Sequence, residues 1–451
     1  MASISLQQAA DWCGGKIDSK YQDVTFAGAN IDSRQLQPGQ LFVALVAARD
    51  GHDFIPSALE KGAAAVLCNH ADGDFPAIVV EDTRIALGQI AAGLLRQMAP
   101  KIIGVTGSVG KSTTKEMIAA VLETTYRVSK TPANHNNDLG MPSAVLAMDE
   151  SSQVVVLEMG MSHFGEIEYL SRLAKPQIGV IINIGTMHIE NLGSQEGILQ
   201  AKLEITTGMG ADGKLLLYGD DSYLWGSRDS LPVSAAYFGV ENESCAVRAK
   251  NVTESAEGIR YTACYAGGEF PVYLPLEGQH YVADSLAAIS AGLALGVTEE
   301  NIQKGLANFR TMEGRQEIFE KNGCTIIKDC YNAGPESMEA ALKVLGNRVG
   351  RKIAVLGDML ELGSHSQAAH EKVGRLAAKY ADVLMCYGQE SSHMLQGAAS
   401  AGMPAAKHYM DKAVLAADLR ALVKAGDVLL FKGSRGMKME QALEMFLQEE
   451  R

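Results

Sequence analysis

The sequence predicts an α/β protein with three domains. Its 451 residues correspond to about three domains at roughly 150 residues each. Apolar runs rich in β-branched residues alternate with segments of helical periodicity along most of the chain. These runs are continuous rather than alternately polar, which is typical of parallel strands covered on both faces. We place the three domains at residues 1–83, 84–312 and 313–451.

The first domain is predicted to be a small α/β unit. A turn-rich stretch, residues 32–39, precedes a short apolar strand, Leu41–Leu45. A helix is expected around Ala58–Ala65. The segment Thr83–Met98 has helical periodicity and leads into the second domain.

The second and third domains both read as mostly parallel sheets with helices between the strands. The strands expected in the second are Lys101–Thr106, Val154–Leu157, Val180–Ile184 and Leu215–Tyr218. A β-rich insertion, Cys245–Leu276, and the helices Val282–Leu295 and Glu299–Leu306 follow them. The strands expected in the third are Thr325–Lys328, Ile353–Leu356, Val383–Tyr387 and Val428–Phe431. This alternation predicts a Rossmann-like, doubly wound C-terminal domain.

Composition excludes several classes of protein. The net charge of −13 argues against nonspecific binding to nucleic acid or to anionic membranes, but not against an anionic substrate at a locally basic site. No apolar run is long enough to span a bilayer, and the first residues lack the pattern of a signal peptide. The 7 cysteines are odd in number, scattered, and without a C-x-x-C pair, which favours reduced thiols. We therefore expect a cytoplasmic protein that is not embedded in a membrane.

A glycine-rich loop is the sharpest chemical signal. Residues Thr106–Thr113 read Thr-Gly-Ser-Val-Gly-Lys-Ser-Thr, between an apolar strand and the helical run Lys115–Leu122. In such a loop the backbone N–H groups and the helix N-terminus face phosphates, Lys111 reaches the outer phosphates, and Ser112 can bind Mg²⁺. Val105 stands where the strict phosphate-loop motif has its first glycine. The loop predicts a central domain similar to P-loop ATPases.

Other candidates are weaker when taken singly. Glu158 ends an apolar strand and could hold Mg²⁺. His188 follows the next strand, and Lys202 lies on a predicted helix; alone, such residues are more often structural or solvated. An amide-rich loop, residues 131–142, could bind a polar ligand or be a plain turn.

Three polar clusters follow strands of the third domain. They are residues 329–335, 357–363 and 432–435. Open α/β sheets bind ligands at the carboxyl ends of their strands, so we expect the clusters to meet at one edge.

Taken in order, these motifs resemble the Mur ligase family over nearly the whole chain. The resemblance rests on the phosphate loop with Glu158, His188 and Lys202, on the three C-terminal clusters, and on Asp32-Ser33-Arg34, Gly278-x-His280 and Gly314-Arg315. The loop Asn134-x-Asn136-Asn137-Asp138 is similar to that of members that add D-alanyl-D-alanine to UDP-N-acetylmuramoyl-tripeptide. The Asp-Asn-Pro-Arg-type motif expected of the sister ligase that adds the third residue does not occur in this chain.

The resemblance implies an ATP- and Mg²⁺-dependent acid–amino-acid ligase that works through an acyl phosphate. It implies catalytic roles for Lys111, His188, Lys202 and Arg315. It implies nucleotide contacts at Thr106, Gly107, Ser108, Gly110, Lys111, Ser112, Thr113, Asp284, Asp329, Tyr331 and Asn332. One Mg²⁺ would be held by Ser112 with Glu158, and a second by His188 with a carbamylated Lys202. Substrate would contact Ser33, Arg34, Asn134, Asn136, Asn137 and Asp138, with the first two at the uridine diphosphate end. Family members commonly have Asn where this chain has Asp284, and that Asn usually contacts adenine.

Two other readings stay open. The chain could be a sister ligase that adds another amino acid or dipeptide, or a nucleotide-dependent switch or binding module built on the phosphate loop. The second leaves Lys202, the amide-rich loop and the third domain without a role. We expect a monomer. The third residue of the tripeptide, lysine or diaminopimelate, is left open.

Overall fold

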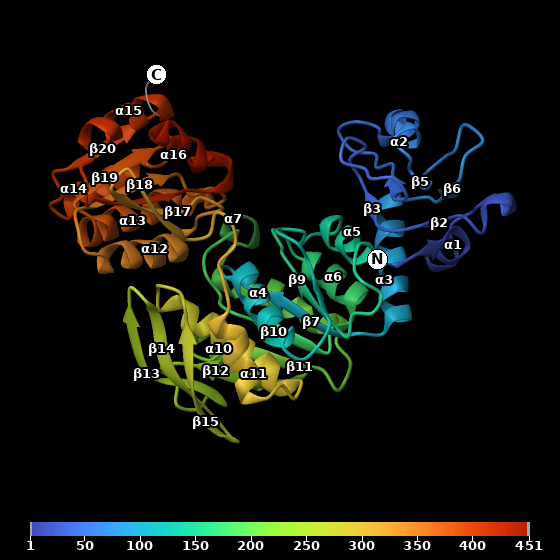
Figure 1. The fold of residues 1–451 in the computed structure, drawn as a ribbon, viewed down its shortest axis with the longest axis horizontal. Coiled ribbons are helices and arrows are strands. Elements are labelled where there is room, and N and C mark those ends of the chain that lie inside the picture. The colour runs from blue at the N-terminus through green and yellow to red at the C-terminus, as the bar shows by residue number, and fades with distance from the viewer. Residues whose placement is uncertain (1, 449–451) are drawn as a thin grey trace.

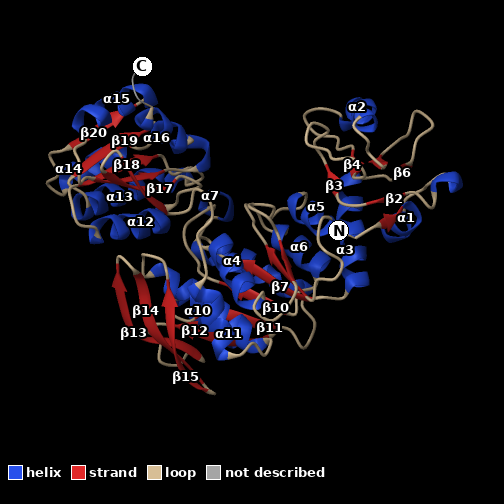
Figure 2. Cartoon of the chain, viewed as in Figure 1, coloured by secondary structure: helices blue, strands red, loops and turns tan. Residues whose placement is uncertain are grey.

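The computed structural model describes residues 2–448 and arranges them as three domains in a V (Figure 1). The N-terminal domain forms one arm and the C-terminal domain forms the other. The middle domain, drawn in cyan to yellow, joins them. Helices and strands alternate in all three domains, so the predicted α/β class is confirmed (Figure 2).

The N-terminal domain is built on a small parallel sheet. Its strands are β3 (Ala29–Asn30), β4 (Leu41–Val43), β5 (Ala65–Cys68) and β6 (Ala77–Val79), in that spatial order. The helices α1 (Leu6–Cys13) and α2 (Ile55–Glu60) and the antiparallel pair β1 (Ile4–Ser5) and β2 (Thr25–Phe26) complete it.

The helix expected around Ala58–Ala65 is partly wrong. The helix ends at Glu60, and Gly62 then adopts a left-handed conformation with φ 88°. Ala65 already belongs to β5, whose four residues are all buried. A glycine that tolerates positive φ lets the chain reverse here and enter the sheet.

The middle domain contains a sheet of nine strands among the described residues. Its order is β15-β14-β13-β12-β11-β10-β7-β9-β8. The parallel part consists of β7 (Lys101–Thr106), β8 (Val128–Lys130), β9 (Val154–Glu158), β10 (Ile178–Ile181), β11 (Lys214–Tyr218), β12 (Ser234–Gly239) and β13 (Val247–Ser255). The predicted β-rich insertion is confirmed: β14 (Gly258–Tyr265) and β15 (Gly268–Leu274) pair antiparallel and extend the same sheet.

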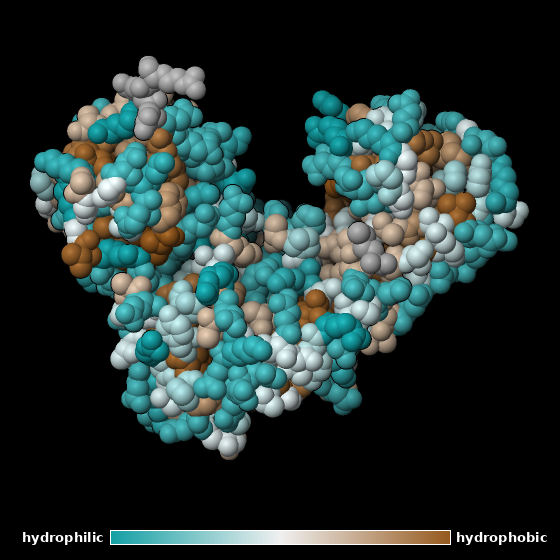
Figure 3. All heavy atoms as spheres, viewed as in Figure 1, coloured by the Kyte–Doolittle hydropathy of each residue, from teal (hydrophilic) through white to brown (hydrophobic). Residues whose placement is uncertain are grey.

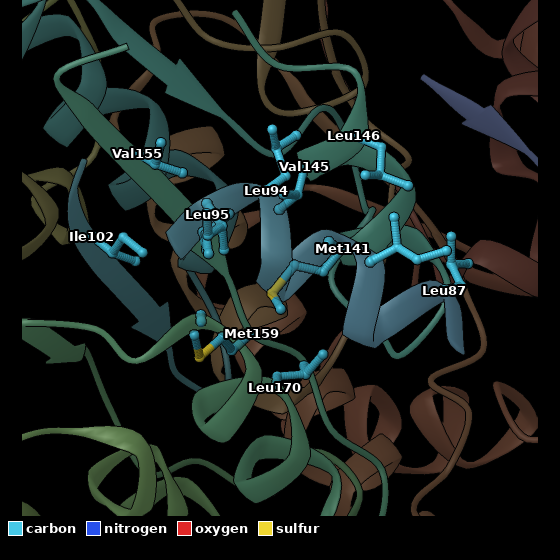
Figure 4. Close-up of a cluster of buried hydrophobic side chains, with 14 of the residues drawn as sticks. Leu87, Leu94, Leu95, Ile102, Met141, Val145, Leu146, Val155, Met159 and Leu170 are labelled. Atoms are coloured by element: carbon cyan, nitrogen blue, oxygen red, sulfur yellow. The ribbon is translucent and has the colours of Figure 1, made fainter. Parts of the chain in front are cut away.

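Helices cover both faces of this sheet. One face carries α4 (Lys111–Leu122), α10 (His280–Ala294) and α11 (Glu299–Ala307). The other carries α3 (Thr83–Met98), α5 (Gly140–Leu146), α6 (Glu166–Ala174) and α8 (Gln195–Leu203), with the short α7 (Ile189–Leu192) and α9 (Ser222–Gly226) nearby. Figure 4 shows the core between the sheet and the helices α3, α5, α6 and α8. In it, Leu94 and Leu95 of α3 and Met141 of α5 approach two residues of the sheet, Val155 and Ile102. Burying these side chains fixes the sheet whose edge carries the site.

Helix α3 also holds the N-terminal domain. The ring of Trp12 from α1 packs on Gly93, where a Cβ would lie 2.2 Å from the indole. The same helix therefore packs on the middle sheet and on α1. The domain boundary placed at residues 83/84 falls at its first turn.

The C-terminal domain is a second doubly wound unit. Its sheet order is β16-β17-β21-β18-β19-β20 within the described residues. The strands are β16 (Glu317–Lys321), β17 (Cys324–Asp329), β18 (Lys352–Gly357), β19 (Val383–Tyr387), β20 (Ala406–Tyr409) and β21 (Val428–Lys432), of which only β16 is antiparallel to its neighbour. The helices α12 (Pro335–Asn347), α13 (Ser366–Tyr380) and α14 (Ser392–Ser400) cover one face, and α15 (Lys412–Leu422) and α16 (Met439–Leu447) cover the other.

Strand order brings the polar loops together. In the middle sheet, β7 lies between β9 and β10, with Glu158 level with Val105 and Ile181 level with Thr106. In the C-terminal sheet, β21 lies between β17 and β18, so the three predicted polar clusters leave neighbouring strands. Among residues 2–448, no helix is both long and apolar enough to cross a membrane.

Candidate active site

The phosphate loop connects β7 to α4. Gly110 has φ 83°, and a Cβ there would lie 2.9 Å from the carboxylate of Asp284, so backbone conformation and space both require glycine. The ammonium of Lys111 donates to the carbonyl oxygens of Gly107 at 2.8 Å and Ser108 at 3.1 Å. Burial lowers the pKa of Lys111. The loop's own carbonyls thus hold its lysine.

Asn183 braces the phosphate loop from the neighbouring strand. Its side-chain oxygen accepts from the N–H groups of Ser108 and Val109, each at 3.0 Å, and its amide donates to the carbonyl of Val109. The expected strand Val180–Ile184 ends at Ile181 because the chain turns here to make these bonds. The sequence analysis did not single out Asn183.

Glu158 offers a buried oxygen toward the loop. Its Oε1 accepts from the amide of Asn136 at 2.9 Å, whereas its Oε2 is buried and lacks a hydrogen-bond partner within the described residues. The nearest cation is the ammonium of Lys115, 3.9 Å away. An orphaned carboxylate oxygen is costly to bury, and a bound Mg²⁺ would satisfy it.

His188 lies beyond the end of β10 and contacts the C-terminal domain. It has a left-handed backbone, φ 64°, and its Nδ1 lies 2.7 Å from Oε2 of Glu361. Its side chain is mostly buried and lines the same cavity as the phosphate loop.

Lys202 is almost completely buried at the end of α8. Its side chain is 2% exposed, and no hydrogen bond or ion pair to it is found in the part of the chain that the structure describes. Burial, with a smaller effect of the nearby Lys111, lowers the pKa of Lys202 well below its ordinary value. An uncharged amine at this position is a nucleophile available to CO₂.

Arg315 reaches across from the C-terminal side. Its guanidinium donates to Oγ of Ser112 at 2.9 Å and lies 4.1 Å over the ring of Tyr331. Nearby, the ammonium of Lys432 lies 2.5 Å from the carboxylate of Asp329 and donates to the carbonyl of Asn332 at 3.0 Å. The predicted nucleotide-binding residues of the last domain thus face the phosphate loop.

Asp284 lies behind the phosphate loop on α10. Its carboxylate accepts from the hydroxyl of Thr114 at 2.7 Å, and only 4% of its surface is exposed. Burial raises its pKa to about 7, partly opposed by the Thr114 bond and by Arg315.

The amide-rich loop is divided between ligand-facing and structural roles. Asn134, Asn136, Asn137 and Asp138 all line the cavity. Asn136 positions Glu158, the side-chain oxygen of Asn137 accepts from the N–H of Gly140 at 2.7 Å, and Asp138 pairs with Arg84 at 2.6 Å. Asn134 is exposed. The turn is therefore observed at Asn137, whereas binding of a polar ligand by this loop stays a prediction.

Ser33 and Arg34 are not brought to this cavity. They lie on a turn of the N-terminal domain, where Ser33 is buried and its carbonyl accepts from Lys61. Arg34 pairs with Asp32 at 2.7 Å and is otherwise exposed. Their expected contact with substrate would require substrate to span the space between the arms.

One cavity of about 1360 Å³ contains most of these side chains. It lies between the middle and C-terminal domains and is lined by Lys111, Ser112, Glu158 and His188 on one side. The other side is lined by residues 312–316 and 328–333 and by Lys432 and Arg435. Of the three predicted polar clusters, 357–363 contributes no lining residue. In Figure 3 an open notch also separates the two arms of the molecule. Within residues 2–448 no three His, Cys, Asp or Glu side chains cluster as a metal site. Lys202 is not among the residues that line the cavity.

Comparisons with known proteins identify the family. The Mur ligase middle domain model matches residues 105–292, the "Mur ligase, glutamate ligase domain" model matches 314–435, and the "Mur ligase family, catalytic domain" model matches 25–94. UDP-N-acetylmuramoyl-tripeptide–D-alanyl-D-alanine ligase of Bacillus subtilis is 39% identical over 98% of both chains. The chain belongs to the Mur ligase family.

Solved structures of Mur ligases agree along the whole chain. A crystal structure of MurF from Acinetobacter baumannii is 32% identical, covers 100% of both chains and superposes with a TM-score of 0.92. MurF ligase from Thermotoga maritima in complex with ADP is 30% identical, covers 93% of this chain and 97% of its own, with a TM-score of 0.82. ATP use, expected from the phosphate loop, is supported by this ADP complex.

Two contacts between the middle and C-terminal domains of this Mur ligase were not predicted from the sequence. Glu336 at the start of α12 accepts from the backbone N–H and the hydroxyl of Thr186 at 2.9 and 3.0 Å. Glu361 belongs to the predicted polar cluster 357–363, but its contact with His188 was not predicted. Residues 150 positions apart give no local signal of contact, so only the fold reveals them.

Proposed function

We propose that this Mur ligase joins D-alanyl-D-alanine to UDP-N-acetylmuramoyl-tripeptide at the expense of ATP. The observation that carries the proposal is the full-length similarity to UDP-N-acetylmuramoyl-tripeptide–D-alanyl-D-alanine ligase. The terminal carboxylate of the tripeptide attacks the γ-phosphorus of ATP, and ADP leaves. The amine of D-alanyl-D-alanine then attacks the acyl phosphate, forms the amide and releases phosphate.

The side chains of the cavity support this chemistry. Lys111 leaves the loop carbonyls to bind the transferring phosphoryl group, and Arg315 leaves Ser112 to approach the same charge. Asp329, Tyr331 and Asn332 hold the nucleotide from the C-terminal side.

Ser112 and Glu158 would hold one Mg²⁺, and His188 with the carbamate of Lys202 would hold a second. The orphaned oxygen of Glu158 and the depressed pKa of Lys202 are the observations that favour these sites. Mg²⁺ bound there would neutralise phosphate charge during transfer.

Substrate is proposed to bridge the arms of the V. Its uridine diphosphate end would lie near Ser33 and Arg34 in the N-terminal domain, and its peptide end near Asn134 and Asp138 at the cavity. We further propose that the enzyme acts as a monomer in the cytoplasm, where ATP is available, without nucleic acid or membrane as a partner.

Mass spectrometry of the product tests the function. The enzyme is incubated with ATP, Mg²⁺ and D-alanyl-D-alanine, and with a UDP-tripeptide ending in either lysine or diaminopimelate. We expect one new amide and one phosphate released per product, with a preference between the two tripeptides. Product with a single amino acid but not with the dipeptide would instead identify a sister ligase. Phosphate release without any amide would identify a nucleotide-dependent binding module.

A further inference from the structure

Glu361 makes a contact between domains that the proposed chemistry does not use. It lies in the loop after β18, and its carboxylate approaches Nδ1 of His188 to 2.7 Å. The His188 side chain is 16% exposed and that of Glu361 is 56% exposed. The contact therefore joins a mostly buried imidazole of the middle domain to a carboxylate presented by the C-terminal domain.

The backbone presenting Glu361 is held in place by its own domain. The N–H of Met359 donates to Nε2 of the buried His370 at 3.0 Å, and the N–H of Leu360 donates to Oγ of Ser434 at 2.9 Å. Glu361 itself has φ 64°, a conformation that non-glycine residues seldom adopt without support. The loop is thus fixed in a shape that aims this one carboxylate.

The short separation places Glu361 beside Nδ1, one of the two nitrogens through which an imidazole can bind a metal. A neutral imidazole that directs Nδ1–H at a carboxylate keeps its lone pair on Nε2. A histidine that binds a metal commonly has such a carboxylate on its other nitrogen, which fixes ring orientation and tautomer. Oε2 of Glu361 lies close to Nδ1 of His188, although the two are not aligned for a hydrogen bond here and Nδ1 has no other hydrogen-bond partner among the described residues. The imidazole also lines the cavity.

We propose that Glu361 is a positioning residue that orients His188 and thereby makes cation binding in the middle domain depend on docking of the C-terminal domain. The proposal rests on the role of His188 as a cation ligand in the proposed function. Because His188 and Glu361 belong to different domains, the dyad exists only while the two domains are in contact. The cation site would be complete only when the C-terminal half of the nucleotide site is also in place.

Binding of Mn²⁺ to the full-length enzyme tests this directly. Mn²⁺ is titrated in the presence of a non-hydrolysable ATP analogue and followed by electron paramagnetic resonance of the free ion. Glu361→Ala should weaken the binding of one Mn²⁺ by about 10- to 100-fold, the usual effect of removing such a partner. Glu361→Gln should weaken it about threefold or more, because its amide can accept from Nδ1 but carries no charge.

Glu190→Ala is the matched control. Glu190 is exposed on α7 and packs against Gly363 at the same domain contact, but it does not face His188 in any contact of the described residues. Its removal should leave Mn²⁺ affinity within about twofold of wild type, since surface carboxylates away from a site contribute little. The kinetics should follow the same pattern. In Glu361→Ala, excess Mg²⁺ should restore much of kcat, while the KM for ATP at saturating Mg²⁺ should change little.

The outcomes separate this proposal from the proposed function. If His188→Ala binds Mn²⁺ and turns over like wild type, His188 is no ligand and that part of the proposed function fails. If His188→Ala is impaired while both Glu361 variants bind Mn²⁺ like wild type, the positioning role is overturned and the function stands. Tighter Mn²⁺ binding in Glu361→Ala would also overturn it, because Glu361 would then compete with the cation. If Glu361→Ala does not fold, Glu361→Gln alone decides the test. Mn²⁺ affinity equal to wild type in Glu361→Gln would then contradict the proposal.

Discussion

At the scale of single residues, Lys202 has the environment least suited to its ordinary charge. A buried ammonium without an anionic partner costs several kcal/mol, and the positive charge of Lys111 adds to this. Losing the proton removes the cost and creates a nucleophile. A carbamate on the same nitrogen would then face Lys111 with the opposite sign of charge, which is favourable at short range.

Substitution of Lys202 should therefore separate a carbamate from a merely buried lysine. Lys202→Ala should lower kcat by at least about 100-fold, as for loss of a metal ligand. Acetate or another short carboxylic acid should partly restore activity by filling the vacated space with a carboxylate. Lys202→Arg should stay inactive with or without acetate, because it keeps the positive charge and cannot be carbamylated. Lys101→Ala, at an exposed lysine, is the control. Wild-type activity in Lys202→Ala or Lys202→Arg would contradict the carbamate.

Asp284 should make stability depend on pH. In the unfolded chain its carboxyl loses its proton near 3.8, whereas in the folded protein it does so near 7. Between these values the folded state keeps a proton that the unfolded state has lost, so the stability contributed by this group falls as pH rises from about 4 to 7. Asp284→Asn keeps an oxygen for Thr114 and has no charge. It should raise the melting temperature by a few degrees at pH 8, corresponding to roughly 2–4 kcal/mol, and change it little at pH 4.

Thermal melting of both proteins between pH 4 and pH 8 measures this difference. Equal gains at both ends of the range would show that the carboxylate is not the cause. A loss of stability in Asp284→Asn at pH 8 would mean that the carboxylate is paired more strongly than by Thr114 and Arg315 alone.

Single residues also show how far a sequence can be interpreted. Lys111, Ser112 and Gly110 were predicted because one short segment contains the strand, the glycines and the helix start that phosphate binding needs. Glu158, His188 and Lys202 could be assigned only through the ordered resemblance to Mur ligases. Asn183 and Glu336 were missed because each acts on a residue far away in sequence, where no spacing rule applies.

At the scale of elements, the predicted strands were mostly correct, and the errors lie at their ends. The helix after the phosphate loop begins at Lys111 rather than Lys115, since the loop itself forms the first turn. The strand expected to reach Ile184 stops at Ile181, since Asn183 is needed by the loop. Tertiary contacts set these boundaries, whereas periodicity sets only the existence and type of an element.

The phosphate loop should keep its folded conformation when Lys111 is replaced. In the absence of nucleotide, Lys111 only donates to carbonyls of its own loop, while Asn183 holds the loop's N–H groups. Lys111→Ala should therefore melt within a few degrees of wild type, yet lose nearly all turnover, by about 100-fold or more in kcat. Melting curves test the unchanged stability, and phosphate release tests the lost turnover. Lys101→Ala is the control for both measurements. Activity near wild type would remove the phosphate-loop assignment.

At the scale of the whole molecule, the two arms differ in how they contact the middle domain. The C-terminal arm already touches it through Arg315 with Ser112, Glu336 with Thr186, and Glu361 with His188. The N-terminal arm is held through α3, and its Ser33 and Arg34 lie apart from the cavity. Figure 3 shows an open notch between the arms.

An acyl phosphate formed in that open state would be exposed to hydrolysis, so catalysis requires the arms to close. The nucleotide site lies between two domains that are already in contact, so an ATP analogue alone should change the shape little. In the proposed function the UDP-tripeptide reaches both the N-terminal arm and the cavity, so adding it with the analogue should draw the arms together. Small-angle scattering should show a smaller radius of gyration with both ligands than with either alone. An unchanged radius with both ligands would contradict closure. A full decrease with the nucleotide alone would place the moving contact at the C-terminal arm, in conflict with the docked contacts of Arg315, Glu336 and Glu361.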